Sequence, residues 1–319
     1  MSGTDGRLRV GVAGVGALGQ HHARVYAALP GAQLTAVHDA DAERAHAVAG
    51  KHGARVARDF DDLLAGCDAL SVATPTVSHH ELALRALRAG RHVLVEKPVT
   101  ATLAQADDLI REAEQRGLVL QVGHIERFNP AAEALYRHGR QARFVEVHRL
   151  GSFSARSLDI DVVLDLMIHD LDVVLALDGS EPVQVEAVGV PVLTPKVDIA
   201  NARLRFASGL IANLTASRVS MDQVRKFRVF APATYVSVDF AAREAQVYRL
   251  EGGAAGPTIA VERTSSPDEE PLRRQLAAFV ESVRKGDPAR VSGRDGRRAL
   301  ALALTILERI QTGLAGGAS

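Results

Sequence analysis

The sequence of 319 residues predicts an α/β protein, in which a doubly wound parallel sheet precedes a second domain with a mostly antiparallel open sheet. Three observations lead to this fold class. Short apolar runs alternate with helical patterns six times before residue 124, and a glycine-rich turn joins the first run to the first helix. After residue 124 the chain changes to successive strand-like runs. We therefore expect two domains, 1–123 and 124–319.

The composition is that of an ordinary globular protein and excludes several classes. Lys+Arg and Asp+Glu number 38 each, so no net field favours nucleic acid or an anionic membrane. No apolar run approaches the roughly 20 residues that a membrane helix needs. The single Cys67 and an N-terminus without a secretory pattern favour the cytoplasm. The histidines lack zinc-like spacing, so we expect no metal site.

The first half alternates strands and helices in order. A strand at 7–13 leads through the glycine-rich turn into a helix that Pro30 and Gly31 end. Predicted strands follow at 33–38, 55–57, 68–73, 92–95 and 118–123, with helices at 41–52, 61–65, 78–89 and 102–116. This alternation is typical of a parallel sheet with helices on both faces.

A dinucleotide fingerprint opens the chain. Gly14, Gly16 and Gly19 form G-x-G-x-x-G between a strand and a helix, with Ala17 and Leu18 inside the turn. Gly14 permits the tight turn, Gly16 lets a pyrophosphate approach the backbone, and Gly19 lets helix and strand pack closely. The free N–H groups of the helix N-terminus attract phosphate. The motif predicts a Rossmann-type dinucleotide site.

Asp39 ends the second strand, 20 residues after Gly19. A carboxylate there accepts hydrogen bonds from a ribose 2′-OH and repels a 2′-phosphate. The next residues, Ala40 and Asp41, offer no arginine for that phosphate, so NAD is favoured over NADP. The alternative is that Asp39 only caps the following helix.

Polar residues also follow three later strands. Thr74 and Pro75 come after the strand at 68–73, Glu96, Lys97 and Pro98 after 92–95, and His124 after 118–123. Ligands collect at the carboxyl ends of parallel strands, so we expect these residues to face one crevice. The bond before Pro98 is a candidate for the cis form.

The second half predicts an antiparallel sheet with one buried face. A short helix at 131–137, a strand at 142–150, a loop at 151–161 and a helix at 162–177 come first. Strand-like runs follow at 183–191, 199–207, 210–219, 226–231, 234–239, 245–250 and 258–263, and helices at 268–285 and 295–313. A tight hairpin turn is expected at 206–210.

The helix at 162–177 contains the candidate acid/base pair. At about 3.6 residues per turn, Asp165 and His169 share a face, with Asp172 one turn beyond. A carboxylate one turn from an imidazole can orient the ring and hold its charged form, which suits general acid/base catalysis. The alternative is an ordinary polar helix face.

In this order, GVGALG at 14–19, TPT at 74–76, EKP at 96–98 and DLMIHDLD at 165–172 resemble the Gfo/Idh/MocA oxidoreductase family across nearly the whole chain. The resemblance implies an NAD-binding Rossmann domain and a C-terminal domain whose open sheet forms a homodimer or homotetramer. It implies that Lys97 and His169 are the catalytic pair, that Asp165 orients the histidine or the substrate hydroxyl, and that Glu96 and His79 contact the cofactor side.

A narrower resemblance concerns the substrate. The run from 149 to 161 and GHIERFNP at 123–130 are similar to segments of the UDP-N-acetylglucosamine 3-dehydrogenase group, although Ser152 replaces a frequent proline. This implies oxidation of the C3 hydroxyl of UDP-N-acetylglucosamine or a related UDP-sugar. Planar guanidinium groups pair bidentately with phosphate, so the candidates for the diphosphate are Arg127, Arg149, Arg156 and Arg218. Further candidate substrate contacts are Asn129, Asp165 and His169. Each arginine taken alone is equally explained as a surface charge.

Hydride transfer from a secondary alcohol needs a base for the hydroxyl proton and a cation for the developing alkoxide. Lys97 and His169 divide these roles in either order. Two alternatives remain open within the same fold: a dehydrogenase of a free sugar or an inositol-like polyol, and an NAD-dependent glycoside-cleaving enzyme. A non-catalytic NAD-binding regulator is a third, against which the presence of both Lys97 and His169 argues.

Overall fold

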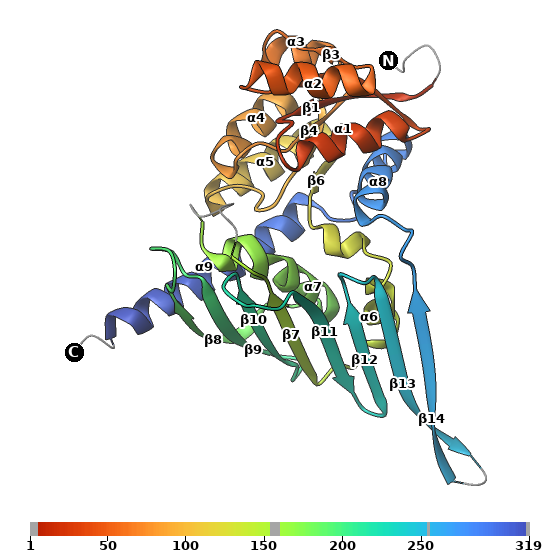
Figure 1. The fold of residues 1–319 in the computed structure, drawn as a ribbon, viewed down its shortest axis with the longest axis vertical. Helices are drawn as coiled ribbons and strands as arrows, with labels where there is room; N and C mark the ends of the chain where they lie inside the picture. Colours follow the sequence, from red (N-terminus) through yellow and green to blue (C-terminus); the bar gives the residue numbers. More distant parts are fainter. Residues whose placement is uncertain (1–5, 154–159, 254–255, 317–319) are drawn as a thin grey trace. The chain divides into compact units, whose positions relative to one another are not determined.

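The structure is a computed structural model that describes residues 6–153, 160–253 and 256–316 (Figure 1). The contacts divide the chain into two compact units. The first contains Met1–Ile125 and Pro271–Arg297, and the second contains Glu126–Glu270 and Arg298–Ser319. Among the described residues, no helix is both long and apolar enough to cross a membrane.

The first unit is built on six parallel strands. Their order is β3-β2-β1-β4-β5-β6, which confirms the predicted doubly wound sheet. The order reverses between β1 and β4, and this switch point is where such sheets bind ligands. The strands are β1 (Leu8–Ala13), β2 (Ala32–His38), β3 (Arg55–Val56), β4 (Ala69–Val72), β5 (His92–Val95) and β6 (Leu120–Val122).

Local signals in the sequence begin and end the helices of this sheet. Asp41 caps α2 by accepting a hydrogen bond from the Arg44 N–H, and Thr102 forms a capping box with Gln105 at α5. Gly53 and Gly117 end these two helices in the left-handed conformation that glycine adopts without strain. The helices are α1 (Gly19–Ala28), α2 (Ala42–His52), α3 (Phe60–Ala65), α4 (Thr76–Arg88) and α5 (Leu103–Arg116).

A helix from the end of the chain completes the first unit. In α8 (Pro271–Lys285), Leu276 and Phe279 are fully buried in one apolar cluster with residues of α1 and β1 (Figure 1). This contact division differs from the two continuous ranges expected from the sequence. The physical reason is that an amphipathic helix must bury its apolar face, and its periodicity does not say against which partner.

The second unit contains the mostly antiparallel sheet, which is confirmed with eight strands in the order β14-β13-β12-β11-β7-β10-β9-β8. Neighbours β7 and β10 are parallel. The predicted hairpin joins β9 to β10, with Gly209 at a φ of 88°. The strands are β7 (Phe144–Leu150), β8 (Pro182–Val190), β9 (Ile199–Phe206), β10 (Ile211–Ser217), β11 (Val224–Ala231), β12 (Thr234–Asp239), β13 (Glu244–Gly253) and β14 (Gly256–Ser265).

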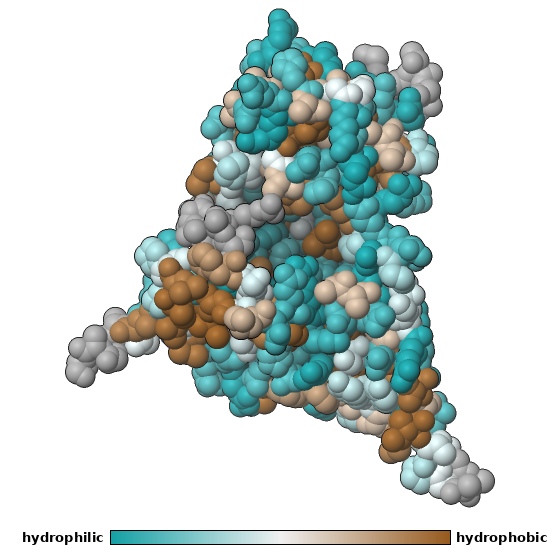
Figure 2. All heavy atoms as spheres, in the orientation of Figure 1, coloured by the Kyte–Doolittle hydropathy of each residue, from teal (hydrophilic) through white to brown (hydrophobic). Residues whose placement is uncertain are grey.

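Three helices cover one face of this sheet: α6 (Ala132–His138), α7 (Ile168–Asp178) and α9 (Gly293–Gly316). Leu135 of α6, Leu171 of α7 and Ile306 of α9 are buried in the core of this unit, where they pack against alternate residues of the strands. Apolar side chains are exposed on and after the edge strand β8, with Val183 at 66% and Leu193 at 61%. Figure 2 shows this apolar surface over β8.

Candidate functional site

A cavity of about 630 Å³ opens at the carboxyl ends of β1, β2 and β4 in the first unit. It lies at the switch point of the sheet, where a dinucleotide is expected to bind. The structure brings most of the predicted cofactor residues to this cavity. Those that line it are Gly14, Gly16, Ala17, Leu18, Asp39, Thr74 and Pro75.

A side chain at each glycine of the fingerprint would meet different surroundings. Gly14 has a φ of +81°, and a Cβ on Gly19 would lie 1.8 Å from the Gly14 carbonyl oxygen. These two glycines therefore shape the turn and the contact of the helix with it. The nearest atom to a Cβ on Gly16 would be a side-chain nitrogen of Arg44 at 3.7 Å, an ordinary contact, so no backbone atom crowds this position. A phosphate can approach the backbone there.

Asp39 lines the cavity and organises the loop around it. One carboxylate oxygen accepts the Val15 N–H at 2.7 Å, and the other accepts the Asp41 N–H at 2.9 Å. The guanidinium of Arg44 lies 3.3 Å from the same carboxylate and also lines the cavity. The sequence prediction missed Arg44 because it considered only the two residues after Asp39. Its place in the first turn of the next helix was the available signal.

The cavity also contains an unsatisfied polar atom. The Oγ1 of Thr74 is buried and has no hydrogen-bond partner within the described part of the chain. Buried polar groups usually have partners, so this hydroxyl is suited to a ligand in the cavity. With the absence of backbone crowding at Gly16 and the carboxylate of Asp39, the residues present fit NAD.

His79 does not line this cavity, although the sequence predicted a cofactor contact. Its Nδ1 lies 2.9 Å from the Pro98 carbonyl oxygen and its Nε2 lies 2.9 Å from that of Thr74. Burial lowers the pKa of His79 despite these two carbonyl groups. The ring thus connects the loop after β4 to the loop after β5, which is a positioning role.

Glu96 is 6% exposed and lies in a buried polar network. His22 Nε2 lies 3.2 Å from its carboxylate, and Gln275 Nε2 donates to the same oxygen at 3.4 Å. His22 Nδ1 lies 2.8 Å from the Ser71 hydroxyl, so the imidazole lies between Ser71 and the Glu96 carboxylate. Burial raises the pKa of Glu96, but His22 and Lys97 outweigh it, and the net pKa lies below the usual value.

The Glu96 carboxylate also excludes any side chain at residue 123. A Cβ on Gly123 would lie 2.4 Å from its Oε1. Sequence reasoning did not single out His22 or Gln275. His22 on α1 and Gln275 on α8 lie beside Glu96 only because of the way these two helices pack, which no local sequence pattern predicts.

Lys97 directly follows β5 in the first unit and is half-buried. Its peptide bond to Pro98 is cis, as the sequence suggested. His124 follows β6 and is fully buried. Lys97 therefore lies where ligands collect in such sheets, one residue after the anchored Glu96.

Asp165 and His169 lie in the second unit, on a helix that differs from the expected one. Val163–Met167 form a π-helical turn, and the α-helix α7 begins only at Ile168. Residues four apart in such a wider turn still lie on nearly the same side of the helix, so the shared face of Asp165 and His169 stays a prediction. Both side chains are half-buried. Single π turns are frequent at functional sites.

Arg149 lies in a buried ion-pair network rather than at an open surface. It is 4% exposed, and its guanidinium donates to both oxygens of Asp170 at 2.6 and 2.8 Å. The Nη2 that donates to Asp170 also lies 3.0 Å from Oε1 of Glu126. Asn129 donates to Glu126 at 3.1 Å and to the Phe240 carbonyl oxygen at 3.0 Å. The structure gives Arg149 and Asn129 internal partners, which argues against the diphosphate contacts expected from the sequence.

The remaining candidate arginines differ in their surroundings. Arg218 is 5% exposed and donates to Asp198 at 2.9 Å and to the Ile160 carbonyl oxygen at 2.7 Å. It is therefore also engaged inside the protein. Arg127 donates to Asp172 at 3.4 Å and remains partly exposed. Arg156 lies outside the described residues.

Comparisons with known proteins agree with this geometry. The sequence model of an oxidoreductase family with an NAD-binding Rossmann fold matches residues 8–124, and that of the GFO/IDH/MocA C-terminal domain matches residues 131–233. The UDP-N-acetylglucosamine 3-dehydrogenase of Acidithiobacillus ferrooxidans is 43% identical over 302 residues, which cover 94% of this chain and 96% of that protein. A solved structure of that enzyme matches with a TM-score of 0.89 and 41% identity, over 96% of this chain and 98% of the other.

Inositol 2-dehydrogenase 1 of Saccharopolyspora erythraea is similar over a comparable length. It is 32% identical over 332 residues, which cover 96% of this chain and 95% of that protein. Both relatives are dehydrogenases that are named for a polyhydroxylated substrate.

Proposed function

The chain belongs to the Gfo/Idh/MocA oxidoreductase family, and within that family we propose that it oxidises the C3 hydroxyl of UDP-N-acetylglucosamine, or of a closely related UDP-sugar, with NAD. The observation that carries the substrate is the 43% identity to the UDP-N-acetylglucosamine 3-dehydrogenase over 94% of the chain. The motif resemblance at 123–130 and 149–161 agrees with it.

The catalytic roles in this proposal go to three side chains. Gly16, Asp39 and Thr74 would hold NAD in the cavity of the first unit, where the cofactor would supply the hydride acceptor for C3 of the sugar. Lys97 and His169 divide removal of the hydroxyl proton and stabilisation of the alkoxide, and Asp165 orients the histidine or the hydroxyl. The fixed position of Lys97 after Glu96 supports its part, because reaction needs a precisely held group.

Contacts to the UDP part are proposed for Arg127 and Arg156. Arg127 is partly exposed, and its planar guanidinium has the geometry that pairs bidentately with phosphate. Arg156 belongs to the segment that resembles the UDP-sugar enzymes. Arg149 and Arg218 are left out of this role because their guanidinium groups are buried against carboxylates.

The substrate is tested by adding NAD and a set of sugars and following NADH absorbance. We expect reduction with UDP-N-acetylglucosamine and none with free N-acetylglucosamine or myo-inositol. A 3-keto product should be trapped by a 3-keto-sugar aminotransferase as a UDP-3-amino sugar, detected by mass spectrometry. Turnover of inositol without turnover of UDP-sugars would instead favour the polyol dehydrogenase, to which the 32% identical relative points.

The catalytic pair is tested with Lys97→Ala and His169→Ala. Each should lower turnover by about 10²- to 10⁴-fold, because a positioned acid/base is removed. The affinity for NAD, measured by calorimetry, should change little. Near-normal turnover of either variant would contradict the role assigned to that residue.

We also propose a cytoplasmic homo-oligomer that assembles through the C-terminal sheet. The face opposite to α6, α7 and α9 carries stacked rings, with centroids 5.6 Å apart for Phe144 and Phe230 and 4.9 Å apart for Phe230 and Tyr235. Phe230 is 37% exposed. Light scattering should show a dimer or tetramer that Phe230→Lys weakens. A monomeric wild type would refute this part.

A further inference from the structure

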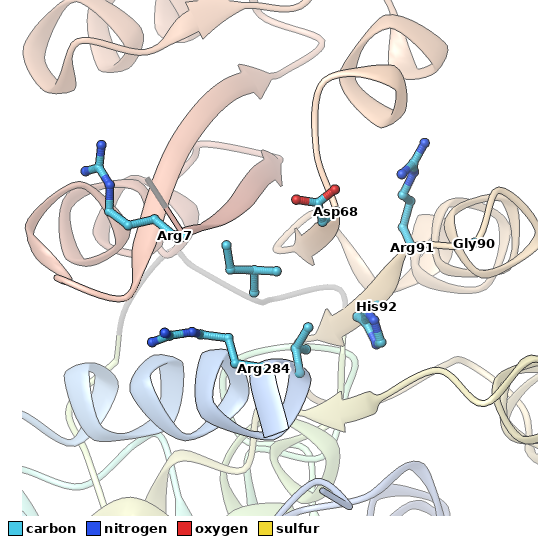
Figure 3. A pocket seen from close by; sticks show the side chains of 9 residues that line it. Arg7, Asp68, Gly90, Arg91, His92 and Arg284 are labelled. Atoms are coloured by element: carbon cyan, nitrogen blue, oxygen red, sulfur yellow. The ribbon is translucent and has the colours of Figure 1, made fainter. Parts of the chain in front are cut away.

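A cavity of about 490 Å³ lies in the first unit, where β1, β4 and β5 begin (Figure 3). Of the residues that line it, Arg7, Arg91 and Arg284 turn their guanidinium groups away from the space between them. The carboxylate of the lining, Asp68, is paired with Arg9 at 2.6 Å. The charged groups of this cavity therefore do not converge on a ligand. A cluster in the second unit is arranged differently, because its polar groups converge on one buried arginine.

This arginine is Arg218, which directly follows β10 and is 5% exposed. Its Nε donates to Oδ1 of Asp198 at 2.9 Å. Its Nη2 donates to the carbonyl oxygens of Ile160 and Val197, at 2.7 and 3.1 Å. These acceptors belong to two segments far apart in the sequence, one just before the π turn and one just before β9. One planar guanidinium thus holds the two segments together.

The carboxylate of Asp198 is a fixed partner for this guanidinium. Asp198 is fully buried, and its Oδ2 accepts the N–H groups of Val192, Leu193 and Thr194 at 2.8, 2.7 and 2.8 Å. Its Oδ1 also accepts the Thr194 hydroxyl at 2.7 Å. A carboxylate with so many donors cannot turn without losing several hydrogen bonds. It therefore anchors the side chain of Arg218.

The backbone of Val197 extends this restraint to the start of the helix. Its carbonyl oxygen accepts hydrogen bonds from both Arg218 and the Val162 N–H, at 3.1 and 2.9 Å. Its N–H donates to Oδ1 of Asp161 at 2.9 Å. The carbonyl oxygen of Asp161 in turn accepts the Asp165 N–H at 3.0 Å. A chain of hydrogen bonds therefore connects Arg218 to the turn that contains Asp165.

The π turn at Val163–Met167 depends on such support from outside the helix. Turns of this kind are rare, and the first N–H groups of any helix need partners that the helix itself does not supply. The N-terminal residue of the turn, Val162, has an apolar side chain that cannot accept a hydrogen bond. The contacts of Arg218 and Val197 with residues 160–162 fix the start of the helix in place of a side-chain cap.

We propose that Arg218 is a positioning residue for the reaction, because it sets where the helix that carries Asp165 and His169 begins. This inference rests on the catalytic roles proposed for those two side chains. A displacement on the order of 1 Å can cost a catalytic group about a hundredfold in rate. Loss of the restraint should therefore lower kcat and leave the KM of the sugar and the affinity for NAD nearly unchanged.

The test uses two variants that weaken the restraint from opposite sides. Arg218→Lys keeps a charge beside Asp198 but lacks the planar fork that reaches Asp198 and Ile160 together. Asp161→Ala removes the acceptor of the Val197 N–H and keeps the buried pair of Arg218 and Asp198. Asp161 is only half-buried, so this variant reports on the restraint even if Arg218→Lys folds poorly.

Amide hydrogen exchange, followed by mass spectrometry, measures the restraint without any substrate. In both variants, exchange at residues 161–169 should become about tenfold faster, the usual effect of losing one charged hydrogen bond. Exchange at residues 171–178, the rest of α7, should change little. The kcat with NAD should fall by about ten- to a hundred-fold, measured with whichever sugar the wild type oxidises. An error in the UDP-sugar assignment then changes the substrate of the assay and not the expected loss.

Arg298→Lys is the matched control. Arg298 on α9 also donates to a carboxylate and to a carbonyl group, those of Glu181 at 2.5 Å and Ser180 at 3.1 Å, and both partners lie outside residues 160–169. This variant should show the exchange and the turnover of the wild type.

Two results would overturn the proposal. One is unchanged exchange at residues 161–169 in both variants. The other is faster exchange throughout the second unit with an unchanged kcat, which would make Arg218 a stabilising residue only. If the wild type oxidises no sugar, the proposed function fails, and the exchange measurement still decides whether Arg218 positions the helix.

Discussion

At the scale of single residues, we expect Asp39 and Arg44 together to set the cofactor preference. Asp39 presents a carboxylate where the 2′-OH of the adenosine ribose of NAD is expected, and it holds Arg44 at 3.3 Å. The guanidinium is therefore already in the cavity, although its charge faces Asp39. Removing the carboxylate would leave Arg44 available to a 2′-phosphate.

Asp39→Ser alone should therefore improve NADP binding and weaken NAD binding, each by about tenfold. The chain contains no Trp, so the direct fluorescence of NADH and NADPH reports binding without interference from Trp. Asp41→Ser is the matched control, because Asp41 also pairs with Arg44 at 2.9 Å but does not line the cavity. If Asp39→Ser/Arg44→Ala gains NADP affinity equally well, the role of Arg44 is wrong.

His22 is expected to affect the reaction only through a neighbouring residue, Glu96. It holds Glu96, which immediately precedes Lys97, and it has no place in the cofactor cavity. A small displacement of a catalytic group can cost a large factor in rate without affecting binding. His22 is therefore a positioning residue for the loop that carries Lys97.

His22→Ala should lower turnover by about ten- to a hundred-fold while the dissociation constant of NAD stays near that of the wild type. His22→Gln should recover part of the rate, because its amide can still donate to Glu96. Steady-state kinetics and calorimetry separate the two effects. A parallel loss of NAD affinity and thermal stability, with no recovery in His22→Gln, would indicate a purely structural role.

At the scale of elements, the ion pair between β7 and α7 holds the helix that carries His169. Arg149 on β7 pairs with Asp170, the residue next to His169. Burial lowers the pKa of Arg149, but Asp170 and Glu126 outweigh it and raise the net pKa above the usual value, so the guanidinium stays charged. The pair fixes α7 against the sheet directly beside the candidate catalytic histidine.

Arg149→Ala should lower the free energy of unfolding by about 3–5 kcal/mol, because two buried carboxylates lose their cation. Urea denaturation measures this loss. Arg205→Ala is the control, since Arg205 is an exposed arginine on β9 of the same sheet. A stable Arg149→Ala variant with weakened UDP-sugar binding would restore the diphosphate role that the sequence suggested.

At the scale of the whole molecule, the end of the chain contributes to both units. Helix α8 packs into the first unit, and most of α9 belongs to the second. The NAD-binding unit is consequently incomplete until residues after 270 have been made. Its stability depends on apolar contacts with α8 and its polar network on Gln275.

Phe279→Ala should destabilise the NAD-binding unit by about 3–5 kcal/mol, because a fully buried ring is replaced by a cavity. The unfolding transition that NAD binding shifts should move to lower urea concentration. Arg273→Ala, an exposed change on the same helix, should leave it in place. An unchanged transition in Phe279→Ala would mean that α8 does not stabilise this unit.

The sequence by itself determined what depends on neighbours along the chain. The glycine fingerprint, the alternation of strands and helices before residue 124 and the strand-like runs after it are local patterns, and they predicted both sheets and the position of Asp39. The tertiary structure alone decided the place of α8, the π turn before His169 and the internal partners of Arg149 and Glu96. These features depend on residues as far apart as Glu96 and Gln275. Periodicity shows that a side chain is buried or charged, but only packing decides which distant group it meets.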